Sequence, residues 1–113
     1  MIYETVCVKD QPVIVLKDWQ VIEVRLPGFD VPTLHFNGYA VENHEGRVSS
    51  PIVAFDRATR IGQTWSGRQY RLQGEPGAYN EDAIYVLRRW LDMKVIAEYR
   101  GATGDIYEAP NFE

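Results

Sequence analysis

Two histidines and two carboxylates gather in the stretch HFNGYAVENHE, and these residue types bind metals or transfer protons. They are His35, Glu42, His44 and Glu45. The histidines are nine positions apart, and no HExxH or similar zinc-binding spacing occurs. His44 and Glu45 fall in a predicted turn. The pattern therefore predicts surface side chains and no metal site.

Nucleophiles and phosphate-binding loops give no stronger signal. The serines at 49, 50 and 66 lie outside any GxSxG motif, and the single cysteine, Cys7, falls in an alternating strand where a small buried side chain is typical. One cysteine also excludes an intrachain disulfide. GEPG at 74–77 precedes a helix but lacks the glycine patterns of nucleotide-binding loops. We expect no cofactor.

An enzyme needs only two or three polar groups that the fold brings together. A pocket between a helix and a sheet is one place where this could happen. The polar residues that we would expect there are His35, Glu42, Arg68 and Tyr70.

A basic segment runs from residue 57 to residue 74, with four arginines and no acid. Interleaved aromatic and basic side chains are typical of surfaces that bind single-stranded nucleic acid by stacking and charge. The other interpretation is a solvated outer face of a sheet. The candidate residues of this basic face are Arg57, Arg60, Trp65, Arg68 and Arg71.

A hairpin positions these arginines. Ser66-Gly67, taken as a two-residue turn, places Trp65 opposite Arg68 and Ile61 opposite Leu72, on one face with Tyr70. Arg60 and Arg71 then point to the other face, which is polar.

A helix is predicted over residues 80–93. Asn80 is a good N-cap and is followed by two acids, where the helix dipole favours them. Lys94 would project into the apolar side, so the helix should end near Met93. The apolar side consists of Ala83, Ile84, Val86, Leu87, Trp90, Leu91 and Met93.

Alternating or short apolar stretches predict strands at 2–9, 13–17, 19–26, 33–43 and 47–55, with a bulge or turn at Asp18. Residues 95–99 predict a last strand, and residues 100–113 an irregular tail. Short turns between successive strands favour neighbouring pairs. We therefore expect an α+β fold: an antiparallel β-meander of about five to seven strands with one amphipathic helix packed on it.

The 113 residues suit one domain, 1–113, and 45% hydrophobic with 25% charged residues is an ordinary globular composition. The net charge of −4 argues against general binding to nucleic acid or anionic membranes. No signal peptide or membrane span is evident, so we expect a cytoplasmic protein. A sheet with one helix often covers its remaining surface by self-association, so we expect a homodimer.

The stretches SSPIVAFD and TWSGRQYRLQGEPGAYNEDAIYVLRRW resemble small uncharacterised bacterial proteins of the mobile gene pool, such as those of integron cassettes. The resemblance covers about residues 49–90. It implies a cytoplasmic accessory protein and carries no catalytic residues.

These observations favour a non-catalytic protein that binds a partner or a small ligand. One alternative is a small enzyme with a pocket between helix and sheet. The other is a binder of nucleic acid or an acidic partner through the hairpin.

Overall fold

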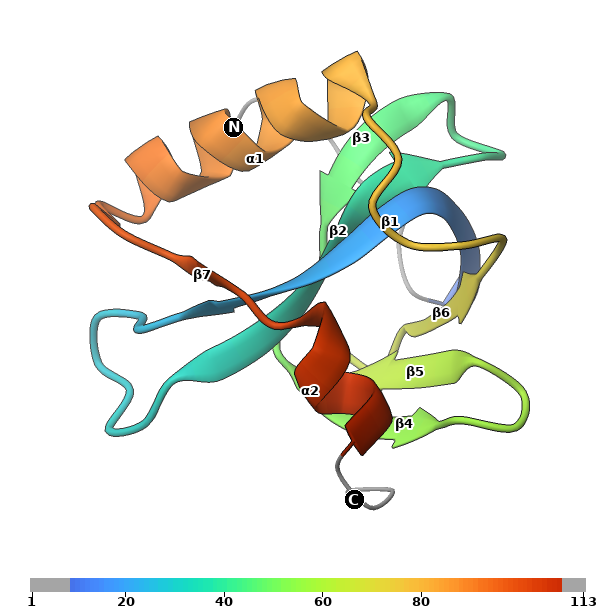
Figure 1. Ribbon diagram of the computed structural model, residues 1–113, viewed down its shortest axis with the longest axis horizontal. Helices are drawn as coiled ribbons and strands as arrows, with labels where there is room; N and C mark the ends of the chain where they lie inside the picture. The colour runs from blue at the N-terminus through green and yellow to red at the C-terminus, as the bar shows by residue number, and fades with distance from the viewer. Residues whose placement is uncertain (1–8, 109–113) are drawn as a thin grey trace.

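The computed structural model describes residues 9–108, which form one seven-stranded sheet and two helices (Figure 1). The sheet order is β3-β2-β1-β6-β5-β4, and β7 pairs with β1. The predicted strand at 2–9 lies outside the described residues, Cys7 included, except for Lys9, which is in a turn. The elements are β1 (Val13–Val24), β2 (Thr33–Ala40), β3 (Glu45–Val48), β4 (Ile52–Asp56), β5 (Ile61–Thr64), β6 (Gln69–Leu72), α1 (Glu81–Met93), β7 (Arg100–Gly101) and α2 (Thr103–Glu108).

The α+β class is confirmed, but the sheet is mixed and is not a pure meander. β1 is long and bends at the predicted bulge, where Asp18 has a φ of 50° and the register with β2 shifts. Its first half pairs in parallel with β6, and its second half pairs with β7 on the same side. Because β2 occupies the other side of β1, two distant segments share one edge, which pairing between successive strands cannot produce.

The predicted register of the β5–β6 hairpin is wrong by one residue on β5. Gly62 pairs with Tyr70 and Gln63 with Gln69, so the loop has three residues instead of two. Gly67, at a φ of 93°, supplies the left-handed residue that such loops require. Gly62 therefore faces inward, where an added Cβ would lie 2.3 Å from the Phe36 ring. This position accepts only glycine.

The sheet curls around an inner core, in which the Phe36 ring lies 5.7 Å from that of Tyr70 and 6.3 Å from that of Phe55. The Tyr70 hydroxyl accepts a hydrogen bond from Arg47 Nε at 3.1 Å. Ile106 of α2 joins the same core. The irregular tail predicted from residue 100 is thus wrong for the described part, because Ile106 and the Thr103 hydroxyl, which binds the Val21 amide, hold α2 on the sheet.

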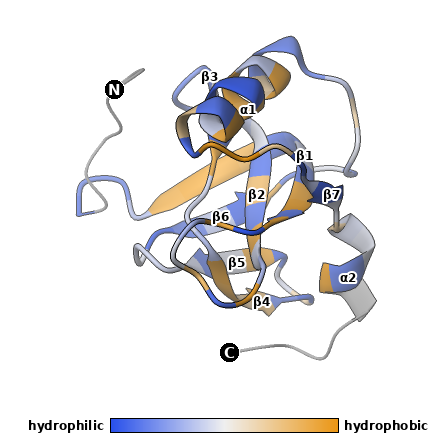
Figure 2. Cartoon of the chain, turned by 90° about the vertical axis from the view of Figure 1, so that its left-hand side faces the viewer, coloured by the Kyte–Doolittle hydropathy of each residue, from blue (hydrophilic) through white to orange (hydrophobic). Residues whose placement is uncertain are grey.

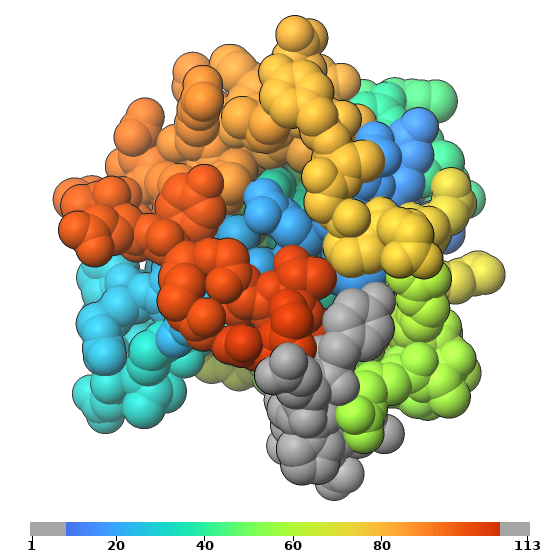
Figure 3. All heavy atoms as spheres, in the orientation of Figure 1, coloured from blue at the N-terminus to red at the C-terminus, as the bar shows by residue number. Residues whose placement is uncertain are grey.

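α1 covers the outer face of β2 and β3, and only part of β1 remains visible between α1 and the β7–α2 segment (Figure 3). The helix is confirmed at its predicted bounds: the Asn80 side chain accepts from the Ala83 amide at 3.0 Å, and Lys94 is the C-cap. Ala83, Val86 and Leu87 are buried against the sheet. The strand predicted at 95–99 is absent, because the chain turns sharply after Lys94 and reaches the sheet only at Arg100.

Candidate functional site

A cleft of about 370 Å³ opens where α1 ends, between that end, the β1–β2 loop and the β5–β6 turn. Three large aromatic side chains, Phe29, Trp65 and Trp90, line it beside aliphatic and serine residues. His35 of β2 lies at its base, and Lys94 joins it from the helix end. The volume lies within the range of roughly 300–1,000 Å³ that is usual for small-molecule sites.

Trp65 forms an exposed wall of the cleft. It is the first residue of the three-residue β5–β6 loop, and its backbone amide donates to Pro51 O at 2.8 Å. Its ring meets that of Phe29 edge to face, with 5.6 Å between the centroids. The side chain is nevertheless 67% exposed. The fold therefore holds a large aromatic surface in contact with solvent.

His35 is almost completely buried, at 1% exposure, although it was predicted to be a surface residue. The prediction was wrong because α1 covers this face of β2, and Trp90 places its ring 4.9 Å from the imidazole. Nδ1 donates to Ser49 O at 2.8 Å, since a carbonyl can only accept. Nε2 lies 2.7 Å from the Thr33 hydroxyl, which donates to it when the ring is neutral.

Burial lowers the pKa of His35 below its usual 6.5, and the positive charge of Lys94 lowers it further, while the hydrogen bond to Ser49 acts in the opposite direction. His35 is therefore neutral near pH 7. Both ring nitrogens already have partners, so the imidazole contributes a fixed polar surface to the cleft and has no free nitrogen to transfer a proton.

Lys94 gives the cleft its charge. The lining contains no aspartate or glutamate. Within residues 9–108, Lys94 takes part in no ion pair. Trp90 and Lys94 lie one helical turn apart, which places the ammonium and the indole on the same side of α1.

The structure separates the residues predicted for a pocket. His35 belongs to the cleft, but Tyr70 is 3% exposed in the inner core. Arg68 is also buried, and its Nε donates to Gln11 O at 3.1 Å. Glu42 is exposed in the turn between β2 and β3. These four side chains do not converge on one point.

The residues of the predicted basic face are also dispersed. Arg57 is exposed in the β4–β5 turn, and Arg71 points outward from β6. Arg60 donates to Gly74 O at 2.6 Å and lies over the Trp19 ring. Arg68 is buried, and Trp65 lies at the opposite end of β5 from Arg60. No single face carries all five.

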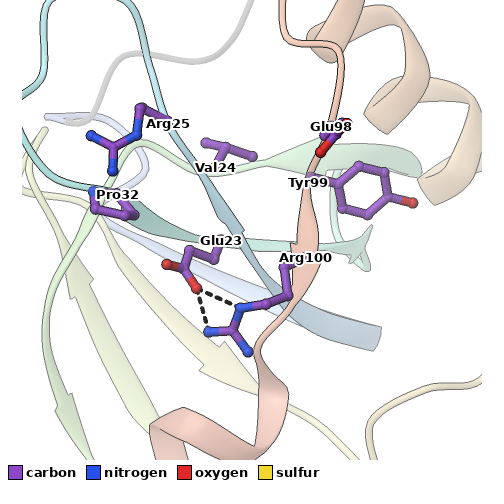
Figure 4. A pocket seen from close by; sticks show the side chains of 7 residues that line it. All are labelled: Glu23, Val24, Arg25, Pro32, Glu98, Tyr99 and Arg100. Carbon is purple, nitrogen blue, oxygen red and sulfur yellow. Dashed lines mark hydrogen bonds and ion pairs between the residues drawn. The ribbon is translucent and has the colours of Figure 1, made fainter.

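A second hollow, of about 240 Å³, lies beside the β1–β7 pair (Figure 4). Its main charges neutralise each other: the Arg100 guanidinium points at Glu23 and also binds Asp105 at 2.6 Å. These carboxylates raise the pKa of Arg100. The hollow is shallow and exposed, Arg100 is already paired, and Arg25 donates to Asp30 O at 3.0 Å, so the hollow is less suited to a ligand than the aromatic cleft.

Sequence reasoning missed Phe29 as a site residue and assigned Trp90 to the core alone. One signal was present: Lys94 continues the apolar side of the helix, where a charged residue is unusual. In the structure, this side of α1 reaches the cleft at Trp90 and Lys94.

Comparisons of the chain with models of protein families, with curated proteins and with solved structures find no match. The part of the chain that the structure describes contains no group of three or more His, Cys, Asp or Glu side chains placed to hold a metal ion. Neither of the two described helices has the length and apolar character needed to cross a bilayer.

Proposed function

We propose that the protein binds a small planar hydrophobic molecule in the cleft between the end of α1 and the β5–β6 turn. The observation that carries this proposal is the exposed ring of Trp65, held in place by Phe29 and facing the same cleft as Trp90. Exposed tryptophan surface is unfavourable in water, and a flat ligand that covers it gains hydrophobic and stacking free energy.

Binding suits this cleft better than proton transfer does. The imidazole of His35 is fixed by the hydroxyl of Thr33 and the carbonyl of Ser49. A fixed ring adds shape and polarity to a binding surface at little entropic cost. The proposal therefore assigns His35 a positioning and packing role.

The test is a titration with 2-naphthamide, a neutral planar probe, followed by calorimetry and tryptophan fluorescence. We expect saturable binding of one molecule, and Trp65→Ala should weaken it roughly three- to tenfold. Tyr85→Ala is the matched control, because Tyr85 is 57% exposed on α1 but does not line the cleft. Failure to saturate, or equal losses in both variants, would contradict the proposal.

A further inference from the structure

The cleft has a charge opposite to that of the whole protein. The chain has a net charge of −4, whereas the cleft lining carries Lys94 and no acid. His35, the other titratable group there, is neutral near pH 7 because it is buried. An apolar site with one cation selects a ligand that carries one negative charge.

The turn after α1 fixes the position of Lys94. The amides of Val95 and Ile96 donate to Asp92 O at 3.1 Å and Leu91 O at 2.9 Å, which is the pattern of a Schellman motif. Ile96 packs in the outer core with Leu91, and Figure 2 shows the hydrophobic colour of this segment below α1. Hydrogen bonds of the turn and the packing of Ile96 therefore fix the backbone that carries Lys94.

A second polar group faces the same space. Ser50 lines the cleft, and its Oγ accepts from the Ser66 amide at 3.2 Å. That bond does not use the hydroxyl proton of Ser50. A serine hydroxyl and a lysine ammonium are both donors, and together they suit the two oxygens of a carboxylate.

We propose that the ligand class is the planar aromatic carboxylates, with the ring between Trp65 and Trp90 and the carboxylate on Lys94. This inference rests on the proposed function, since it names the chemistry of the molecule that the cleft binds. Lys94 is then the residue that determines specificity. The aromatic walls provide affinity for any flat ring, and the ammonium selects the acid.

The test compares 2-naphthoate with 2-naphthamide, which share a ring system and differ in charge. We expect the native protein to bind the acid about tenfold more tightly than the amide at low salt, since a charge-assisted hydrogen bond has about that effect. Lys94→Gln should remove this preference, because the acid loses its charged partner and its affinity falls towards that of 2-naphthamide. Added salt should reduce the preference in the native protein, whereas Lys94→Gln has no preference left to reduce.

Arg88→Gln is the matched control, because it removes the same charge from an exposed position of α1 that does not line the cleft. It should keep the tenfold preference. Equal binding of both probes to the native protein would overturn the ligand class and leave the proposed function standing. If both variants lose the preference, the preference for the acid comes from the net charge of the protein, and the role of Lys94 is overturned. Failure of both probes to bind would overturn the proposed function and this inference together.

Discussion

The two faces of the β1–β2 pair are buried in different ways. On the inner face, the curled sheet and α2 close around Phe36. A Cβ added to Gly62 would have no room beside this ring. On the outer face, α1 covers only part of the sheet, and its end leaves Trp65 exposed beside Trp90. The closed face holds the fold together, and the open face leaves aromatic surface exposed to solvent.

Truncation of Phe36 should give the largest effect on stability. This ring is fully buried, so Phe36→Ala leaves a cavity and should lower the free energy of unfolding by about 3–5 kcal/mol. Trp65→Ala should lower it by less than about 1 kcal/mol, because Trp65 is 67% exposed. Urea unfolding measures both. Equal losses would show that the cleft aromatics belong to the folding core.

The contact between α1 and β3 tests the outer face. A Cβ on Gly46 would lie 2.2 Å from the carbonyl oxygen of Asp82 in the first turn of α1. Gly46→Ala should therefore displace the helix and cost about 1–3 kcal/mol, measured by thermal unfolding. Gly104→Ala is the control, since nothing lies within 4 Å of its added Cβ. A harmless Gly46→Ala would show that α1 is loosely attached.

The buried histidine should make stability depend on pH. Below about pH 6.5 the unfolded chain protonates His35, whereas the folded protein, with its lowered pKa, does not. Stability should thus fall as the pH drops from 6.5 towards the folded pKa, by at most about 1.4 kcal/mol per pH unit. His35→Asn should reduce this slope in urea titrations, with His44→Asn as the exposed-histidine control. Identical slopes in the native protein and His35→Asn would contradict the burial of a neutral ring.

The smallest effect concerns the turn that holds Lys94. Val95 is 85% exposed and has a φ of 57°, a conformation that a β-branched residue rarely adopts. Val95→Gly should relieve this strain and raise the free energy of unfolding by about 1 kcal/mol. Val31→Gly, at an exposed valine without a positive φ, should give no gain. The thermal midpoint of Val95→Gly should therefore rise above that of Val31→Gly. If both midpoints change in the same direction, the claim that Val95 is strained is contradicted.

Local signals in the sequence were reliable guides to local structure. Asn80 caps α1, and Asp18 marks the bulge in β1. The parallel pairing of β1 with β6 could not be predicted, because it depends on which distant segment fills a free edge. Neither could the hairpin register, since it depends on the fit of Gly62 against Phe36.

The candidate site could be predicted only in part. His35 was expected in a pocket between helix and sheet, and it lies under α1. Its neighbours in the cleft come from a loop, a turn and a helix end, and their convergence is a property of the whole fold. Self-association, a cytoplasmic location and the resemblance of residues 49–90 to integron-cassette proteins stay predictions.

The indole N–H signals of the three tryptophans, followed by NMR during titration with 2-naphthoate, test the central claim most directly. Trp65 and Trp90 line the cleft, whereas Trp19 is fully buried and donates its indole N–H to Gly74 O at 3.1 Å. We predict that the Trp65 and Trp90 signals shift with one shared saturation curve and that the Trp19 signal does not move. A shift of Trp19 alone, or no shift in any of the three, would contradict the claim that the cleft is the binding site.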